Sequence, residues 1–291
     1  METSMNPLFG PAGNSDSFAA AGNKSIDDVP QYIVSMNLDA YEYQGGHGIN
    51  ISEEHARAFG KSASEAGIAL SVHAPYYISM SSVEPDKRAN SIEYILQSAR
   101  AAKYMGARRV VVHSGSCAKI TREQALELAI DTFKKACAAL DAEGLSDIHI
   151  CPETMGKINQ LGTVEEVMEL CRLDERLIPC IDFGHINART FGGLKTIADF
   201  EAIFETIENK LGQYRLTNFH SHFSKVEYTL KGGEKNHLTF EDRLFGPDFE
   251  PLAELVYKKG CSPIFICESA GTQAEDAKIM KNIYNKIAEG E

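Results

Sequence analysis

Histidine, aspartate and glutamate recur in this sequence at the ends of short apolar runs rich in β-branched residues. These run ends carry His73, His113, Glu153, Asp182, His185, His220, His222 and Glu268. Single polar side chains so far apart in the sequence act together only if strands bring their ends to one place. Imidazole and carboxylate groups are combined in catalytic zinc and manganese sites, often with one position left open. The pattern therefore predicts a site for several metal ions at one mouth of a barrel.

The candidate metal ligands are His73, His113, Glu153, Asp182, His185, His222, His237 and Glu268. One zinc ion takes three or four protein ligands, so this set suffices for two or three metals if a carboxylate is shared. Metals about 3.5–4 Å apart can stabilise both the attacking and the leaving oxygen in phosphodiester cleavage. His220 shares its parity with His222, so either could be the ligand of that run. His149 stays unassigned.

Composition narrows the class of protein. The chain has 291 residues, is 43% hydrophobic and carries a net charge of −12. An acidic chain argues against an indiscriminate polyanion binder, although a locally positive groove or bound cations can reverse the sign at one site. The seven cysteines form no CxxC pair, and we find neither a signal-like start nor an apolar stretch of about 20 residues. We therefore expect a reduced, cytoplasmic protein that does not span a membrane and has no obligate protein partner.

Strand-like and helix-like segments alternate along the whole chain. Strands are expected at 8–10, 40–44, 68–76, 108–116, 147–154, 177–185, 216–224 and 262–269, with helical patterns between and after them. A polar loop over 225–246 interrupts this rhythm. Eight such pairs predict an α/β fold, a (β/α)8 TIM barrel formed as a single domain over residues 1–291. The alternative is an open, doubly wound sheet, in which fewer strands would serve the ligand site.

Several of these motifs resemble endonuclease IV, a family of metal-dependent apurinic/apyrimidinic endonucleases, in an archaeal, short-loop form. The resemblance covers roughly residues 6 to 288, and its most specific parts are HAPY (73–76), VVHSGS (111–116), PETMGK (152–157), CIDFGHINAR (180–189), HFSK (222–225), GEKNH (233–237) and CES (267–269). It implies a TIM barrel of the xylose isomerase-like superfamily with three zinc ions at its mouth. It also implies incision of damaged double-stranded DNA 5′ to abasic sites in base excision repair.

The resemblance assigns the ligands to individual metals. His73, His113 and Glu153 would hold the first, and Glu153 would bridge to a second that is held by Asp182, the 216–224 histidine and Glu268. His185 and His237 would hold the third. Glu153 and Glu268 are the expected catalytic carboxylates. Two or three Zn²⁺ are expected, with Mn²⁺ as an alternative.

The chain also departs from the family pattern. Lys235 stands two positions before His237, where the family usually has an aspartate, and the adjacent Glu234 could replace that ligand. The loop QGGHG (44–48) lacks the bulky basic residue that the family inserts into DNA. Tyr76 matches an aromatic residue near the abasic nucleotide. The expected substrate-binding residues are Tyr76, Lys225 and Arg189, and Lys119, Arg122, Lys157 and Lys231 are further candidates for phosphate contacts.

Two other functions stay open. Sugar isomerases and epimerases of the same superfamily usually hold one metal, and Glu153, Asp182, His222 and Glu268 would be that minimal set. The glycine-rich 44–48 loop suits a small substrate, whereas the extra histidines disfavour this function. A non-catalytic metal-binding or nucleic-acid-binding module is the third possibility. The number of metal ions per chain discriminates between the first two functions.

Overall fold

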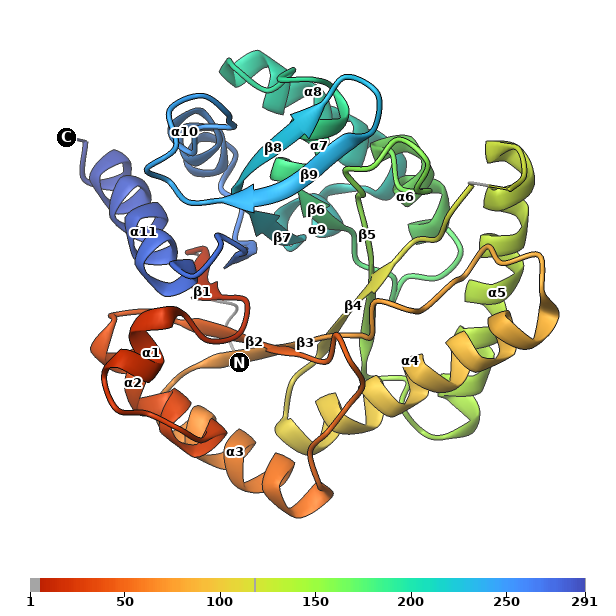
Figure 1. Cartoon of the computed structure of the whole chain (residues 1–291), viewed down its shortest axis with the longest axis horizontal. Helices are drawn as coiled ribbons and strands as arrows, with labels where there is room; N and C mark the ends of the chain where they lie inside the picture. The colour runs from red at the N-terminus through yellow and green to blue at the C-terminus, as the bar shows by residue number, and fades with distance from the viewer. Residues whose placement is uncertain (1–5, 118, 291) are drawn as a thin grey trace.

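Eight parallel strands form the centre of the molecule (Figure 1). The computed structural model describes residues 6–117 and 119–290. Hydrogen bonds join the strands in the order β1-β10-β7-β6-β5-β4-β3-β2, and every pairing is parallel. The strands are β1 (Leu8–Pro11), β2 (Ala40–Gln44), β3 (Ala69–His73), β4 (Arg109–His113), β5 (His149–Glu153), β6 (Cys180–Asp182), β7 (His220–Phe223) and β10 (Ile264–Cys267). The predicted TIM barrel is confirmed.

The barrel closes where β1 meets β2. Ala12 forms a parallel bridge with Glu42, and the backbone N–H of Gly13 donates to the Glu42 carbonyl at 3.0 Å. A Cβ atom on Gly10 would overlap the carbonyl group of Ala40. Glycine is therefore required at this close approach, because any side chain would force the two strands apart.

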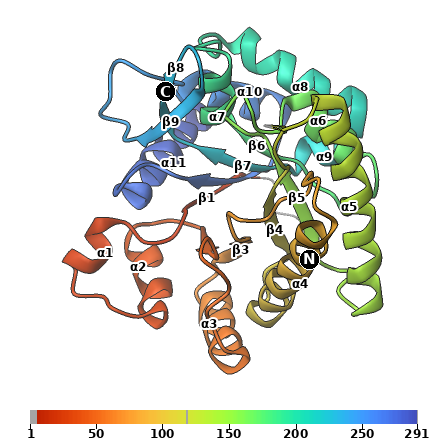
Figure 2. The same ribbon diagram turned by 45° about the vertical axis from the view of Figure 1, so that its right-hand side comes forward.

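Helices surround the barrel (Figures 1 and 2). The helix α3 shows why they form, because Ala56, Phe59, Gly60 and Ala63 recur at helical spacing on one buried face. Ser52 caps its first turn by accepting from the His55 N–H at 3.2 Å. The helices are α1 (Asp16–Ala20), the 3₁₀ turn η1 (Ile26–Asp28), α2 (Val29–Ser35), α3 (Glu53–Glu65), α4 (Pro85–Met105), α5 (Arg122–Ala142), α6 (Val164–Cys171), α7 (Phe183–Arg189), α8 (Ile197–Leu211), α9 (Gln213–Thr217), α10 (Glu250–Lys259) and α11 (Gln273–Glu289).

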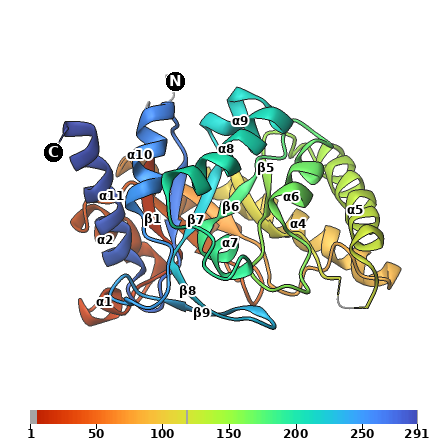
Figure 3. The same ribbon diagram turned by 90° about the horizontal axis from the view of Figure 1, so that it is seen from above.

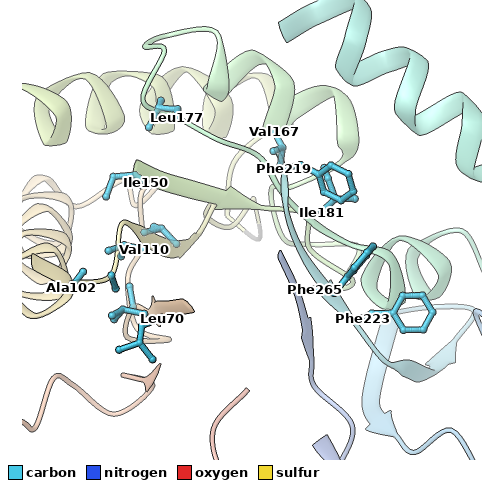
Figure 4. Packing of buried hydrophobic residues seen from close by; sticks show 14 of the residues in the cluster. Leu70, Ala102, Val110, Ile150, Val167, Leu177, Ile181, Phe219, Phe223 and Phe265 are labelled. Carbon is cyan, nitrogen blue, oxygen red and sulfur yellow. The ribbon is translucent and has the colours of Figure 1, made fainter. Parts of the chain in front are cut away.

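Side chains alternate between two cores along each strand. In β4, Val110 and Val112 belong to the large core between strands and helices, part of which is shown in Figure 4. Val111 belongs to a separate small cluster inside the barrel, together with Cys151, Ile178 and Cys180. Because strand side chains alternate with a period of two, His113 points into the same interior as Val111, one layer nearer the mouth. This alternation places the polar strand ends around a single opening.

Two segments differ from the sequence expectation. The strand predicted over 177–185 is only β6, because Asp182 ends it and caps α7, whose first residue is Phe183. The loop predicted over 225–246 contains an antiparallel hairpin of β8 (Lys225–Thr229) and β9 (Gly233–Leu238). Figure 3 shows this hairpin beside α7 at one end of the barrel. Within the described residues, none of the helices is long and apolar enough to cross a membrane.

Candidate metal centre

The predicted ligands converge at the carboxyl ends of the barrel strands. A cavity of about 740 Å³ lies there, and its wall includes His73, His113, Glu153, His185, Glu234, His237 and Glu268. Five overlapping groups of potential ligand atoms come together in the described residues, each with all its ligand atoms within 4.8 Å of one another, and three of the five together contain every predicted ligand. These three groups are His73/His113/Glu153, Glu153/Asp182/His222/Glu268 and His185/Glu234/His237.

The first group is built from the ends of β3, β4 and β5. Nε2 of His73 and Nε2 of His113 lie 3.6 and 3.5 Å from Oε2 of Glu153. Nδ1 of His73 lies 2.8 Å from the carbonyl oxygen of Ala74. Donation to that carbonyl places the proton of a neutral ring on Nδ1, so that Nε2 faces the carboxylate in the orientation a metal ligand needs.

The central group shares Glu153 with the first. Nδ1 of His222 lies 3.0 Å from Oε1 of Glu153 and 3.4 Å from Oε1 of Glu268. Asp182 uses Oδ1 to accept from the backbone N–H of His185 at 2.7 Å, as the N-cap of α7. Its other oxygen, Oδ2, has no hydrogen-bond partner among the described residues and lies 3.2 Å from Nδ1 of His185. Helix capping thus orients this carboxylate.

The third group combines α7 with the hairpin. Nδ1 of His185 lies 3.0 Å from the carbonyl oxygen of Thr154, and its Nε2 lies 3.4 Å from Oε2 of Glu234. Nδ1 of His237 lies 2.8 Å from Oγ of Ser224. A Cβ on Gly156 would approach the Cβ of Glu234 to 2.6 Å, so glycine permits this close packing of loop against hairpin.

A bulge explains why Glu234, and not residue 235, faces the site. Glu227 pairs with Asn236, but the next residue, Tyr228, pairs with Glu234. Lys235 is therefore the extra residue of a β-bulge, and its Nζ reaches outward to Oε1 of Glu227 at 2.6 Å. The bulge reverses the alternation between Glu234 and His237, so both side chains point to His185.

Burial and charge set the protonation of the groups. Burial raises the pKa of Glu268 to about 8, and the neighbouring Asp182 and Glu153 carboxylates add to the shift. Burial also opposes the charge on Glu153, but His222 and His73 outweigh it and hold the Glu153 pKa well below its usual range. Burial lowers the pKa of His113 to about 4, so its imidazole is neutral and able to coordinate at pH 7.

Two buried carboxylate oxygens support the fit to cations. Oε2 of Glu153 and Oδ2 of Asp182 have no hydrogen-bond partner within residues 6–117 and 119–290. Leaving a buried carboxylate oxygen unpaired is costly unless a cation compensates it. The donors are imidazole and carboxylate, which suit Zn²⁺ and Mn²⁺. The chain's own residues therefore fit a site for more than one divalent metal.

The histidines of β7 have different roles. Nδ1 of His222 faces the central group, whereas Nε2 of His220 lies 3.0 Å from Oε2 of Glu42, deeper in the barrel. His220 and His222 also form a possible ligand group with the Cys180 thiol. The structure thus favours His222, as the sequence context did. Glu42 was missed because it ends no apolar run, and its inward parity in β2 was the only signal.

The three predicted substrate-binding residues lie in different surroundings in the structure. Tyr76 lines the cavity, is 53% exposed, and its ring lies 6.0 Å from that of His113. Arg189 is different, because its guanidinium donates to four carbonyls, those of Met155, Lys157, Ile158 and Gln160. It braces the loop that carries Lys157, and it does not present its donors to the cavity.

Lys225 also faces away from the cavity. Its Nζ donates to the carbonyl of Asp242 at 2.6 Å and lies 3.2 Å from the Asp248 carboxylate. Both Arg189 and Lys225 are predicted to contact substrate, and the contacts that the structure shows for them are with backbone carbonyls and with the Asp248 carboxylate. Arg122 likewise bonds Glu166. Lys157 lines the cavity, with its Nζ 3.8 Å from Glu234. His149 lies at the opposite end of β5 from Glu153.

Comparison with known sequences gives a consistent family. A family model described as xylose isomerase-like TIM barrel matches residues 30–283. An uncharacterized protein of Methanocaldococcus jannaschii is 31% identical over 280 residues, which cover 96% of this chain and 97% of that protein. A probable endonuclease 4 of Mycoplasma pneumoniae is 29% identical over 196 residues, or 66% of this chain and 63% of that protein.

Solved structures show the same fold. Endonuclease IV from Thermus thermophilus has a TM-score of 0.64 at 16% identity and covers 98% of this chain and 100% of that chain. A D-tagatose 3-epimerase-like protein has a TM-score of 0.70 at 21% identity and covers 89% and 93%. At these identities the likeness concerns the fold alone, so endonuclease and epimerase chemistry must be separated at the site.

Proposed function

This chain belongs to the family of xylose isomerase-like TIM barrels, and from that premise we propose that it is a zinc-dependent phosphodiesterase that cuts DNA 5′ to abasic sites. The relatives described as probable endonuclease 4 support this proposal. Damaged double-stranded DNA is the proposed partner. Two or three Zn²⁺ are the proposed cofactors.

One observation carries the proposal: three ligand groups meet in one cavity, and two of them share Glu153. A sugar epimerase needs only the central group. In an epimerase, five further potential ligands would have no metal ion to bind: His73, His113, His185, Glu234 and His237. Phosphodiester cleavage does need several cations, because negative charge develops on the attacking and the leaving oxygen at once.

The protein residues have distinct tasks in this reaction. Bound zinc would supply Lewis acidity that polarises the phosphodiester and activates a water molecule. Glu153 and Glu268 line the cavity, and in our proposal they orient that water toward the phosphorus. Tyr76 offers an exposed ring face on which a nucleotide beside the lesion can stack. Lys157 supplies a cation on the cavity wall.

The lesion provides selectivity. Unstacking a nucleotide costs least where the base is already missing, so an abasic nucleotide enters a recessed site at the smallest penalty. The acidic chain and the short 44–48 loop give little general attraction to duplex DNA. We therefore propose that the enzyme relies on this local weakness of the duplex and on its metals, with few contacts to the flanking backbone.

Incision of an end-labelled duplex tests the proposal. Zinc-loaded protein should cut a duplex with one abasic site immediately 5′ to the lesion and leave the undamaged duplex intact. The Glu153→Gln variant is the matched control and should be inactive, because it loses the charge shared by two groups. Intact abasic duplex, in a reaction where an authentic endonuclease cuts, would rule out the function.

A ketose 3-epimerase is the second candidate. It is favoured by the central group, in which Glu153, Asp182, His222 and Glu268 alone could hold one metal. The epimerase-like structural neighbour has the same fold. Epimerisation of a free ketose by protein that holds one metal equivalent, without DNA incision, would establish this function instead.

A further inference from the structure

Glu42 is a carboxylate buried inside the barrel beneath the metal centre. Its side chain is fully buried, and it lies at an inward position of β2. Oε1 is 3.0 Å from Nε2 of His222, and Oε2 is 3.0 Å from Nε2 of His220. A buried charge of this kind persists only when it is paired, and here two imidazoles pair with it.

The contact with Glu42 determines which nitrogen of His222 can give up a proton to a metal ion. Nε2 lies 3.0 Å from Oε1 of Glu42, with no hydrogen-bond partner among the described residues, and the carboxylate beside it favours a proton on this nitrogen. The other nitrogen, Nδ1, faces Glu153 and Glu268, at 3.0 and 3.4 Å from their nearest oxygens. A metal ion held by these two carboxylates must displace any proton on Nδ1, because only an unprotonated ring nitrogen can bind a metal ion.

We propose that Glu42 is a positioning residue: it fixes His222 in the tautomer that presents Nδ1 to the central ligand group and thereby sets metal affinity there. The inference rests on the metal-binding part of the proposed function, not on the choice of DNA as substrate. A carboxylate behind a ligating histidine also makes the ring a stronger donor.

The surroundings of Glu42 hold it in place for this task. Ser71 donates its hydroxyl to Oε2 at 2.9 Å. Gln44 donates its side-chain amide to Oε1 at 3.3 Å and also lines the cavity. His220 occupies the second carboxylate oxygen, which keeps Glu42 from rotating away from His222. Gln44 in the cavity wall is therefore linked through Glu42 to His222, on the side of the His222 ring that faces away from the central ligand group.

The conservative and the disruptive variant of Glu42 separate this role from simple packing. Glu42→Leu removes both acceptors, whereas Glu42→Gln keeps one oxygen that can still face His222. We expect Glu42→Leu to bind one of its zinc ions about 10–100-fold more weakly in competition with a chromophoric chelator. Glu42→Gln should fall between that variant and the wild type. The remaining zinc ions should keep their affinity.

Ser221→Ala is the matched control. Ser221 is buried on the same strand as His222, but its hydroxyl bonds the carbonyls of Ile181 and His222 and does not touch Glu42. This variant can lose stability, yet it should keep the zinc affinity of the wild type. An equal loss of affinity in Ser221→Ala would overturn the proposal, since disturbed packing would then suffice.

A spectroscopic measurement reads the tautomer directly. In zinc-loaded protein with ¹⁵N-labelled histidine, His222 should show a protonated Nε2 and a metal-shifted Nδ1, and Glu42→Gln should weaken the Nε2 proton signal. Wild-type zinc affinity in both Glu42 variants would refute the positioning role. Zinc binding that depends on Glu42 in a protein without incision activity would remove only the DNA substrate.

Discussion

The Glu153 carboxylate joins two ligand groups, because Oε2 lies near His73 and His113 while Oε1 lies near His222. Closely spaced carboxylates repel one another in this site, and the neighbouring histidines offset that repulsion. In the absence of a cation, burial raises the pKa of Glu268 to about 8. Zinc must therefore displace a proton from this carboxyl group when it binds.

Stability of the metal-free protein should fall as pH rises from 6.5 to 9. Burial raises the Glu268 pKa to about 8, and the carboxylates around His185 overcome its burial and raise the pKa of that residue to about 9. Both groups hold a proton in the folded chain that the unfolded chain releases at lower pH, so the stability they contribute is lost through this window. The lowered pKa of His113, about 4, acts only below pH 6.5.

Urea unfolding with EDTA at pH 6.5 and pH 9 measures this effect. Glu268→Gln should flatten part of the pH dependence, because it removes one of the titrations that cause the loss of stability. A metal-free protein that becomes more stable toward pH 9 would show that the sign is wrong.

Tyr76 should determine how tightly damaged DNA binds. Stacking of a base on an aromatic ring is worth about 1–3 kcal/mol, so Tyr76→Ala should raise KM for abasic duplex by about tenfold or more with little change in kcat. Tyr76→Phe keeps the ring and should stay near the wild type. Steady-state kinetics on the incised duplex decide this, and a fall in kcat alone would place Tyr76 in the chemistry.

At the scale of elements, the hairpin β8–β9 completes the third ligand group. Its backbone is fixed to the loop after β5, since the Ile158 N–H donates to Gly232 and the Glu234 N–H donates to Gly156. Within it, the bulge at Lys235 turns Glu234 toward His237. The hairpin therefore supplies two of the three side chains of the third group, and Nδ1 of its His237 also lies 3.9 Å from Oε2 of Glu268 in the central group.

Glu234→Ala should remove one metal ion per chain. It leaves only His185 and His237 in the third group, whereas a zinc ion takes three or four protein ligands. Lys235→Ala changes a side chain that points away from the site and should keep all the metals. Elemental analysis of both variants is the measurement. An unchanged metal count in Glu234→Ala would mean that Glu234 is not a ligand of the third metal.

The elements also show what could be predicted from the sequence. Strand ends with a single histidine or carboxylate were visible as breaks in apolar runs, so His73, His113, Glu153 and Glu268 could be placed at the barrel mouth. Glu234 could be offered only as a neighbour of Lys235, because a bulge leaves no clear mark in one sequence. The four carbonyls that Arg189 bonds could not be predicted, because no sequence pattern reveals how a loop folds around a guanidinium, and its role toward a substrate stays a prediction.

At the scale of the whole molecule, the barrel must close before the ligands meet. The order of strands followed from the alternation of segments, but the seam between β1 and β2 did not. Closure brings Glu42 of β2 under His222 of β7, so the interior network depends on it. Gly10 is the residue that permits the approach.

Gly10→Ala should destabilise the protein by about 1–3 kcal/mol, because the added methyl group overlaps the Ala40 carbonyl and the strands must separate. Gly232→Ala is a suitable control, since its Cβ would meet only the Thr229 hydroxyl at 3.3 Å. Urea denaturation compares the two variants. Equal stabilities would show that the seam can relax without cost.

The central claim is that one barrel mouth holds several metal ions through three ligand groups. Elemental analysis of the purified, zinc-reconstituted protein tests it most directly, with His237→Ala as the internal comparison. We predict about three zinc ions per wild-type chain and about two in the variant. One equivalent per chain in both proteins would contradict the multi-metal centre and leave the single-metal epimerase as the function to pursue.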